Sequence, residues 1–124
     1  MKDRPASATG RQGERVALRF LESKGLLLLE QNYRRPFGEI DLVMRERDCL
    51  VFVEVRVRRR SAFGDGFSSI TAAKRKKLWR AASAYLKSHP QLQKLDCRFD
   101  AISITKDEQG FHPVWIPGAF EHGE

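Results

Sequence analysis

The sequence lacks the features that mark zinc fingers, disulfide-rich domains and membrane proteins. Its 124 residues include only two cysteines, Cys49 and Cys97, which have no C-x-x-C spacing. We therefore expect two reduced, buried thiols and neither a zinc site nor a disulfide framework. No apolar run approaches the roughly 18 residues of a membrane span, and the start "MKDRPASATGRQGE" lacks the apolar segment of a signal peptide. These absences predict a cytoplasmic protein without a membrane partner.

Other common functional motifs are also absent. The two glycines Gly10 and Gly13 form a G-x-x-G without the Lys-Ser/Thr pair of a phosphate-binding loop. The histidines are scattered without the spacing of metal ligands, which predicts surface or loop positions. They are His89, His112 and His122. Any catalytic chemistry is therefore expected to depend on other side chains.

What the sequence has in excess is positive charge. Lys and Arg number 23 against 16 Asp and Glu, which gives a formal net charge of +7 and a pI near 9.8. This balance favours a polyanionic partner, either a nucleic acid or an anionic membrane surface. The length suits one domain. We expect a flexible arm over residues 1–10 and a single domain over residues 11–124.

Hydrophobic periodicity predicts an α/β domain. Apolar spacing predicts helices over residues 12–24 and 71–88, and Gly25 is a stop signal for the first. Period-two segments predict strands over 26–34, 39–44, 50–57 and 97–104, with a proline-limited edge strand over 111–120. The resulting order is α-β-β-β-α-β-β, with a mixed central sheet.

Acidic residues interrupt the most apolar part of this pattern. The stretch "FGEIDLVMRERDCLVFVEVRVRRR" reads as a hairpin with its tip at Arg47-Asp48, so paired residues have numbers that sum to 95. Asp41 then lies opposite Glu54, and Glu39 lies opposite Arg56 as a structural partner. Two carboxylates about 5 Å apart repel each other unless a positive charge lies between them. This pairing predicts a divalent cation.

Two helix residues are expected beside this pair. Glu14 shares the apolar stripe of the first helix with Leu18 and Leu21, at the helix's N-terminal end. Lys74 lies four residues before Leu78 on the second helix, so its ammonium group can extend toward the same place. Mg²⁺ prefers oxygen ligands and commonly uses one or two carboxylates with waters and phosphate oxygens. Asp41 and Glu54, with Glu14 as a third ligand, suit Mg²⁺ or Mn²⁺.

Basic residues follow the acidic strand and open the second helix. Both runs are suited to track a phosphate backbone, and we see no helix suited to read base edges. The expected nucleic-acid-binding residues are Arg58, Arg59, Arg60, Lys74, Arg75, Lys76 and Lys77. Branched, flapped or single-stranded DNA are the candidate partners, and RNA stays open. Further along the chain, Arg98 and Asp100 alternate onto one strand face, which predicts an internal salt bridge.

These motifs carry a resemblance to known families. "GEID" followed by "FVEVR", with Asp41 thirteen positions before Glu54, looks like the PD-(D/E)-x-K nuclease motif. The chain also resembles the YraN family of uncharacterised bacterial proteins over most of residues 10–105. The matching segments are "GRQGERVALRFLESKG", "NYRRPFGEIDLV", "LVFVEVRVRR", "FGDGFSSITAAKRKKLWRAASAYL" and "CRFDAISI".

The resemblance implies a restriction-endonuclease-like fold related to the Holliday-junction resolvases, with a metal-dependent nuclease centre. Its implied catalytic residues are Glu14, Asp41, Glu54 and Arg56. Arg56 departs from the nuclease motif, which has Lys at this position, although Arg is compatible with the YraN pattern. Because Arg stays protonated, Arg56 can stabilise phosphate charge or orient water but cannot act as a general base. Resolvase-like geometry is consistent with a homodimer on a branched junction.

Three functions remain open from the sequence. The first is a nuclease that hydrolyses phosphodiesters in structured or single-stranded nucleic acid. The second is a non-catalytic nucleic-acid-binding module with a degenerate metal site, and the third is an interaction protein that uses the fold without nucleic acid. As isolated features, Asp41 and Glu54 would be ordinary cross-strand residues, and "AKRKK" would be a solvated helix face. Only their conjunction with Glu14, Lys74 and the family pattern favours the nuclease.

Overall fold

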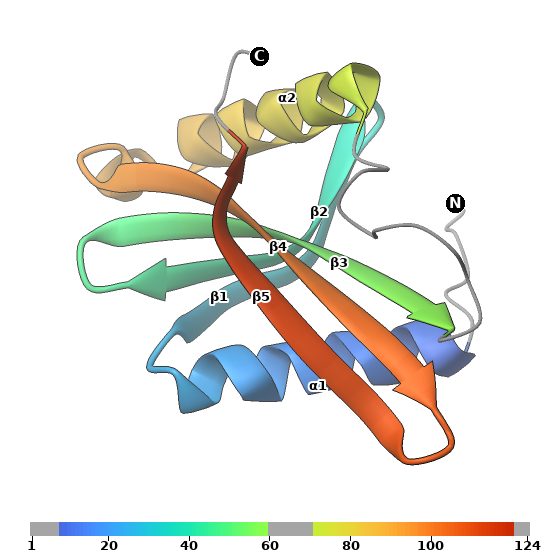
Figure 1. The fold of residues 1–124 in the computed structure, drawn as a ribbon. Coiled ribbons are helices and arrows are strands. Elements are labelled where there is room, and N and C mark those ends of the chain that lie inside the picture. The colour runs from blue at the N-terminus through green and yellow to red at the C-terminus, as the bar shows by residue number, and fades with distance from the viewer. Residues whose placement is uncertain (1–7, 60–70, 121–124) are drawn as a thin grey trace.

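The computed structural model describes residues 8–59 and 71–120, and two helices and five strands account for most of them (Figure 1). In chain order the elements are α1 (Ala8–Ser23), β1 (Leu27–Arg35), β2 (Gly38–Glu46), β3 (Cys49–Arg59), α2 (Ala72–Ser88), the short 3-10 turn η2 (Pro90–Leu92), β4 (Asp96–Asp107) and β5 (Gly110–Phe120). This order confirms the α-β-β-β-α-β-β prediction and the α/β class.

The main difference from prediction lies at the start of α1. The helix begins at Ala8, four residues before the expected start, so it includes residues that were assigned to the arm. Residues 1–7 lie outside the described part of the chain, as do the glycine-containing loop over 61–69, Arg60 and His122. What the sequence predicts for these residues stays a prediction.

The sheet is mixed, as predicted. Its strand order is β1-β2-β3-β4-β5, with β3 and β4 parallel and the other neighbours antiparallel. Two-residue turns join β1 to β2 and β2 to β3, whereas α2 lies between the parallel strands, which need a long crossover. Arg47 has φ 56°, as a tight hairpin turn requires, and this confirms the predicted tip at Arg47-Asp48. The proline-containing β5 is an edge strand, also as predicted.

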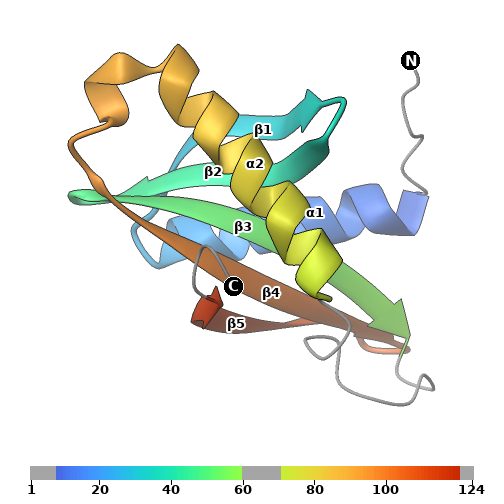
Figure 2. The same cartoon turned by 90° about the horizontal axis from the view of Figure 1, so that it is seen from above.

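One helix covers each face of the sheet (Figures 1 and 2). Val51 and Val53 belong to the core cluster beside α1, and Leu50 and Phe52 belong to the cluster beside α2. This confirms the predicted alternation of β3. Because both faces are covered, both sets of side chains are apolar, and an acid on either face of β3 enters a buried layer.

The helix ends use local signals that the sequence shows. Gly25 has φ 98° and follows α1, where its N–H donates to the carbonyl of Glu22 and the next N–H donates to the carbonyl of Leu21. This pattern is a glycine C-cap. At the start of α2, Thr71 Oγ1 accepts a hydrogen bond from Lys74 N at 3.1 Å. The cap fixes the first turn of α2, which carries Lys74.

Two further predictions concern the burial of the two cysteines and the absence of a membrane span. Both cysteines are free, and Cys49 is partly buried, but Cys97 is exposed. The expectation of a buried Cys97 is therefore wrong, because this residue lies near the start of β4, where the neighbouring Leu95 and Asp96 are also partly or fully exposed. Of the helices in the described residues, none is long and apolar enough to cross a membrane.

Candidate functional site

The predicted acidic pair lies where strands β2 and β3 separate. Their ladder runs from Glu46 and Cys49 to Leu42 and Val53, in the predicted register, and ends one pair before Asp41 and Glu54. Beyond this point Asp41 Oδ2 accepts a hydrogen bond from Val55 N at 2.7 Å. A side-chain carboxylate thus takes the place of a backbone acceptor at the open end of the ladder.

An irregularity in β2 explains the position of Asp41. Ile40 and Leu42 are two residues apart, yet they belong to core clusters on opposite faces of the sheet. The alternation of the strand therefore breaks at Asp41. On the neighbouring strand, Asn32 has φ 54° and lies between the residues paired with Leu42 and Ile40. Both strands turn here, and Asp41 is directed toward β3.

The surroundings of Asp41 disfavour the ionised form of its carboxyl group. Desolvation of its carboxyl group is the largest cause that raises its pKa, and repulsion from Glu54 is the next. Glu14 and Glu39 add smaller repulsions, while the hydrogen bond from Val55 N opposes them. The net effect raises the pKa of Asp41 from 3.8 to about 8. Three neighbouring acids therefore act on Asp41 at this place.

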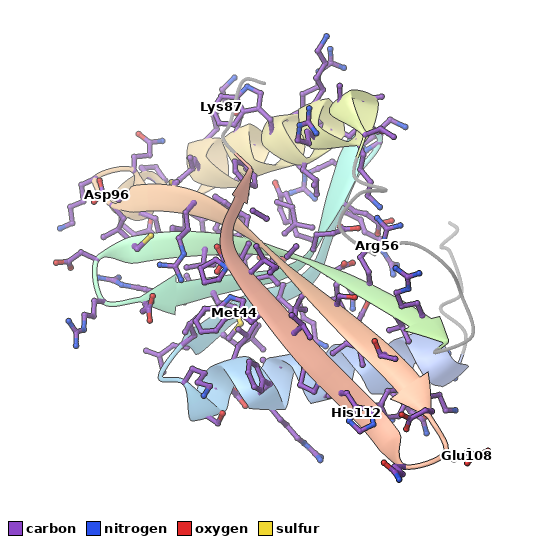
Figure 3. All side chains as sticks on the ribbon, viewed as in Figure 1. Met44, Arg56, Lys87, Asp96, Glu108 and His112 are labelled. Atoms are coloured by element: carbon purple, nitrogen blue, oxygen red, sulfur yellow. The ribbon has the colours of Figure 1, made fainter. Side chains whose placement is uncertain are left out.

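Glu54 differs from Asp41 because it has cationic partners. It is 6% exposed, and its Oε2 lies 2.7 Å from Lys74 Nζ and 4.0 Å from Arg56 Nη1. Arg56 Nη1 is itself buried and has no hydrogen-bond partner among the described residues. Figure 3 shows Arg56 beside β3, between the levels of the two helices. The site thus contains a buried donor that faces the acids and lacks an acceptor.

The position of Glu14 depends on the glycine that precedes it. A Cβ atom at Gly13 would collide with Val57 Cγ2, so the absence of a side chain lets α1 approach β3 closely. This contact brings Glu14 near enough to Asp41 to raise its pKa. Sequence reasoning missed the role of Gly13, although a glycine inside an amphipathic helix is a recognisable signal of close packing.

Glu39 has a different partner from the one predicted. It is paired with Arg34 across β1 and β2, and its Oε1 lies 3.2 Å from Arg34 Nε. The expected opposition to Arg56 does not occur in the ladder, because the β2–β3 pairs end before reaching it. Its expected role as a structural residue is consistent with this exposed ion pair.

The predicted basic residues divide into two groups. Lys74 contacts Glu54 and thus belongs to the acidic centre, and Arg58 follows Arg56 on the same face of β3. The others lie on the first turns of α2, where Arg75 is partly buried and Lys76 and Lys77 are exposed. The side chain of Arg59 and the whole of Arg60 are outside the described residues.

The predicted salt bridge between Arg98 and Asp100 is confirmed and has further partners. Asp100 is fully buried and accepts from Arg98 Nε at 3.0 Å, Trp115 Nε1 at 2.9 Å and Gly118 N at 2.9 Å. Arg98 also contacts Glu46 at 2.9 Å. Hydrogen bonds to Asp100 raise the pKa of Arg98 above its usual range, against the opposing effect of desolvation, which is the largest single cause. This network joins β2, β4 and β5 and is structural.

The acidic centre can be compared with what a metal ion requires. Within residues 8–59 and 71–120, no three His, Cys, Asp or Glu side chains are grouped so that they could hold a metal as they stand. Mg²⁺, however, commonly uses only one or two protein carboxylates and completes its shell with waters and phosphate oxygens. Asp41 and Glu54 fit that requirement, because they are neighbouring carboxyl groups, and Glu54 is close enough to be the largest cause after desolvation that raises the pKa of Asp41.

Comparison with known proteins identifies the family but no activity. Residues 13–104 match the uncharacterised protein family UPF0102. A UPF0102 protein of Nitrosomonas europaea is 47% identical over 116 residues, which cover 94% of this chain and 96% of the relative. The corresponding protein of Alkalilimnicola ehrlichii is 46% identical over 116 residues, covering 94% and 89%, and that of Nitrosococcus oceani is 43% identical over 111 residues, covering 90% of each. The chain therefore belongs to the uncharacterised UPF0102 family, the YraN family that its motifs resemble.

Proposed function

We propose that this protein is a divalent-metal-dependent endonuclease of the PD-(D/E)-x-K type, with a restriction-endonuclease-like fold. The observation that carries the proposal is the position of Asp41 and Glu54 at the open end of the β2–β3 ladder, close to Glu14 and beside Arg56, whose Nη1 has no hydrogen-bond acceptor among the described residues. The carboxylates supply oxygen ligands, and the guanidinium supplies a donor for a phosphate oxygen. Both favour phosphodiester hydrolysis, because they stabilise negative charge on the phosphate group.

Asp41 and Glu54 would hold Mg²⁺ or Mn²⁺, with Glu14 as a further acid nearby. When bound, the cation would neutralise charge on the phosphate and promote ionisation of a water molecule. The protein's own contribution is positional. The hydrogen bond from Val55 N fixes the direction of the Asp41 carboxylate, and the α2 layer excludes water from Glu54, which strengthens its interaction with any cation.

Arg56 has a specific role in this proposal. Its Nη1 is buried close to Glu54 and has no hydrogen-bond acceptor in the part of the chain that the structure describes, which is costly for a charged donor. A non-bridging phosphate oxygen is a suitable acceptor, and a charge-assisted hydrogen bond to it would stabilise the charge that develops during hydrolysis. Since Arg stays protonated, Arg56 binds the phosphate and does not remove a proton from water.

The proposed substrate is structured or single-stranded nucleic acid, with branched or flapped DNA as the first candidate. The net charge of +7 and the exposed Lys76 and Lys77 at the start of α2 favour contact with phosphates. Lys74 and Arg58 bring this basic surface to the edge of the acidic centre. Contacts of this kind recognise shape and charge, so we propose selection by structure and not by base sequence. A two-fold dimer would suit a branched junction.

The test is cleavage of labelled junction, flap, single-stranded and duplex DNA, and of RNA, with Mg²⁺, Mn²⁺ or EDTA. Asp41→Ala and Glu54→Ala should abolish cleavage while leaving the protein folded, as judged by circular dichroism. Asp48→Ala is the matched control, because Asp48 is an exposed acid on the same hairpin and the substitution is the same. Cleavage that survives in EDTA, or in both site variants, would refute a metal-dependent centre here.

One observation favours the second function, a nucleic-acid-binding module without catalysis. Lys74 already compensates the charge of Glu54, and position 56 is Arg, so the centre can be stable without metal. In that case wild type, Asp41→Ala and Glu54→Ala would all bind DNA with salt-dependent affinity and none would cleave it. Cleavage by wild type alone selects the enzyme.

A further inference from the structure

The contact between Lys74 and Glu54 uses the same carboxylate that the proposed metal needs. Lys74 Nζ lies 2.7 Å from Glu54 Oε2, within the range of a charge-assisted hydrogen bond, whereas Arg56 Nη1 lies 4.0 Å away. Lys74 is therefore the main counter-ion of Glu54 in this structure. An ammonium group at this distance occupies one of the directions from which a cation would approach Oε2.

We propose that Lys74 is a displaceable counter-ion of Glu54. It pairs with the buried carboxyl group in the metal-free protein, leaves it when a divalent cation binds, and is then available to the phosphate group of the nucleic acid. This inference rests on the proposed metal centre. The nuclease motif has a lysine on β3 at position 56, where this chain has Arg, and the inference gives that place in the site to Lys74 of α2.

Lys74 and Arg56, the two cationic neighbours of Glu54 within residues 8–58 and 71–119, differ in how readily they can move. The Lys74 side chain is 42% exposed and reaches Glu54 from the first turn of α2, so its ammonium group can turn toward solvent without disturbing the core. The Arg56 side chain is 27% exposed, and its Nη1 is buried. Lysine also has a flexible stem and a compact charge, whereas the guanidinium group is planar and rigid. Lys74 is thus the partner suited to exchange.

The charges of the acidic centre also favour exchange over a purely structural salt bridge. Lys74 contacts Glu54, whereas Asp41 Oδ2 accepts its hydrogen bond from Val55 N, at the open end of the same ladder. A divalent cation can compensate Asp41 and Glu54 together, which a single ammonium group contacting Glu54 does not do. Binding of the divalent cation to Glu54 would replace the ion pair between Lys74 and Glu54. The ammonium group of Lys74 would then lie beside the bound phosphate.

The first test measures Mn²⁺ affinity by electron paramagnetic resonance of the free ion. Lys74→Met keeps the apolar stem and removes the competing charge, so we expect it to tighten Mn²⁺ binding about tenfold relative to wild type. The matched control is Lys87→Met on the last turn of the same helix, 13 residues and hence about 20 Å further along α2 (Figure 3). That control should stay within twofold of wild type, and Lys74→Arg, which keeps the charge, should stay close to it.

The second test uses wild-type protein and does not depend on the folding of a variant. Ammonium groups held in ion pairs exchange their protons slowly enough for ¹H–¹⁵N detection, and Lys74→Arg identifies the signal of Lys74. Titration with diamagnetic Mg²⁺ should shift or broaden this signal at the concentration where Mg²⁺ binds. The exposed Lys87 should show no comparable change.

The outcomes separate this inference from the proposed function. Mn²⁺ binding by wild type that is no tighter in Lys74→Met than in Lys87→Met, together with an unchanged Lys74 signal, would overturn the exchange and leave the nuclease standing. Tighter binding in Lys74→Met with no cleavage by any form would support the exchange and refute the nuclease. If wild type and Lys74→Met both fail to bind Mn²⁺, the metal centre and the exchange fail together.

Discussion

Two acids of this protein, Asp100 and Asp41, differ in the hydrogen-bond donors that surround them. Asp100 accepts hydrogen bonds from Arg98, Trp115 and the backbone of Gly118, so its charge is compensated by fixed donors. Asp41 accepts one from Val55 N and is repelled by other carboxylates. A fully satisfied acid stabilises the fold, whereas an uncompensated acid is a candidate for ligand binding. This contrast assigns Asp100 to the structure and Asp41 to the function.

The raised pKa of Asp41 predicts how stability depends on pH without metal. Between pH 4 and 8 the native state retains the proton that the unfolded state releases, so this carboxyl group lowers stability as pH rises through that window. Asp41→Asn mimics the protonated form and can still accept from Val55 N. In EDTA we expect its melting temperature to exceed that of wild type by several degrees at pH 8 and by much less at pH 4. A difference that is the same at both pH values would contradict this, and Asp48→Asn is the control.

Loss of Asp100 should unfold the protein more readily than loss of an exposed acid. Asp100→Ala would leave Arg98, Trp115 Nε1 and Gly118 N without their acceptor, and breaking a buried ion pair typically costs about 3–5 kcal/mol. Asp48→Ala removes an exposed pair with Arg45 and should cost less than about 1 kcal/mol. Urea unfolding at pH 7 measures both. Similar losses for the two variants would show that the network does not stabilise the sheet.

Parts of this residue-level arrangement could be predicted from the sequence. The register of β2 and β3 as far as Leu42 and Val53 follows from the turn at Arg47-Asp48, because a two-residue turn fixes the pairing of the hairpin. The hydrogen bond from Val55 N could not be predicted, since it needs the ladder to end before Asp41. That ending depends on the turned backbone at Asn32 in the neighbouring strand, and no local pattern in the sequence specifies it.

The two helices approach the sheet closely at two glycines, where a side chain would not fit. A Cβ atom at Gly13 would collide with Val57, and one at Gly38 would collide with the backbone carbonyl of Lys77 in α2. The first contact sets α1 against β3, and the second sets α2 against the start of β2. The N-terminal half of each helix, which carries Glu14 in α1 and Lys74 in α2, thereby lies close to the acidic strands.

Gly13→Ala tests the close approach of α1 to β3. Alanine normally favours a helix over glycine by about 1 kcal/mol, but overpacking costs about 1–3 kcal/mol. Val57 is β-branched and stiff, so we expect the overpacking to dominate and the variant to lose roughly 1 kcal/mol. Val57→Ala removes the colliding methyl group. In that background Gly13→Ala should become neutral or stabilising, and an equal loss in both backgrounds of a chemical-denaturation cycle would exclude the contact as the cause.

For the molecule as a whole, positive charge and the acidic centre act together. The net charge of +7 attracts a polyanion, and the acids would repel it without a bound cation. The N-cap at Thr71 fixes the first turn of α2, and Lys74 in this turn contacts Glu54. The basic residues at the start of α2 therefore lie next to the acids. Binding of nucleic acid and of metal should therefore favour each other.

The proposed phosphate contacts predict a salt dependence of DNA binding. Each phosphate contact contributes about 0.9 to the slope of log K against log salt for duplex DNA and about 0.7 for single strands. Replacement of Lys76 and Lys77 by Ala should lower that slope by between about 1 and 2. The charge-matched control is Lys87→Ala with Lys94→Ala, both exposed and beyond the first turns of α2. Fluorescence anisotropy at several salt concentrations gives the slopes, and equal reductions in the two double variants would refute a specific contact surface.

The sequence by itself determined the α/β class, the order of elements, the hairpin register and the family. These depend on local spacing, since period-two and period-3.6 patterns, a two-residue turn and a C-capping glycine act over a few residues. Only the tertiary structure decided that Lys74 contacts Glu54, that Glu14 approaches Asp41 and that Glu39 pairs with Arg34. Those contacts join different elements, and they depend on close helix approaches and strand irregularities that no single segment encodes.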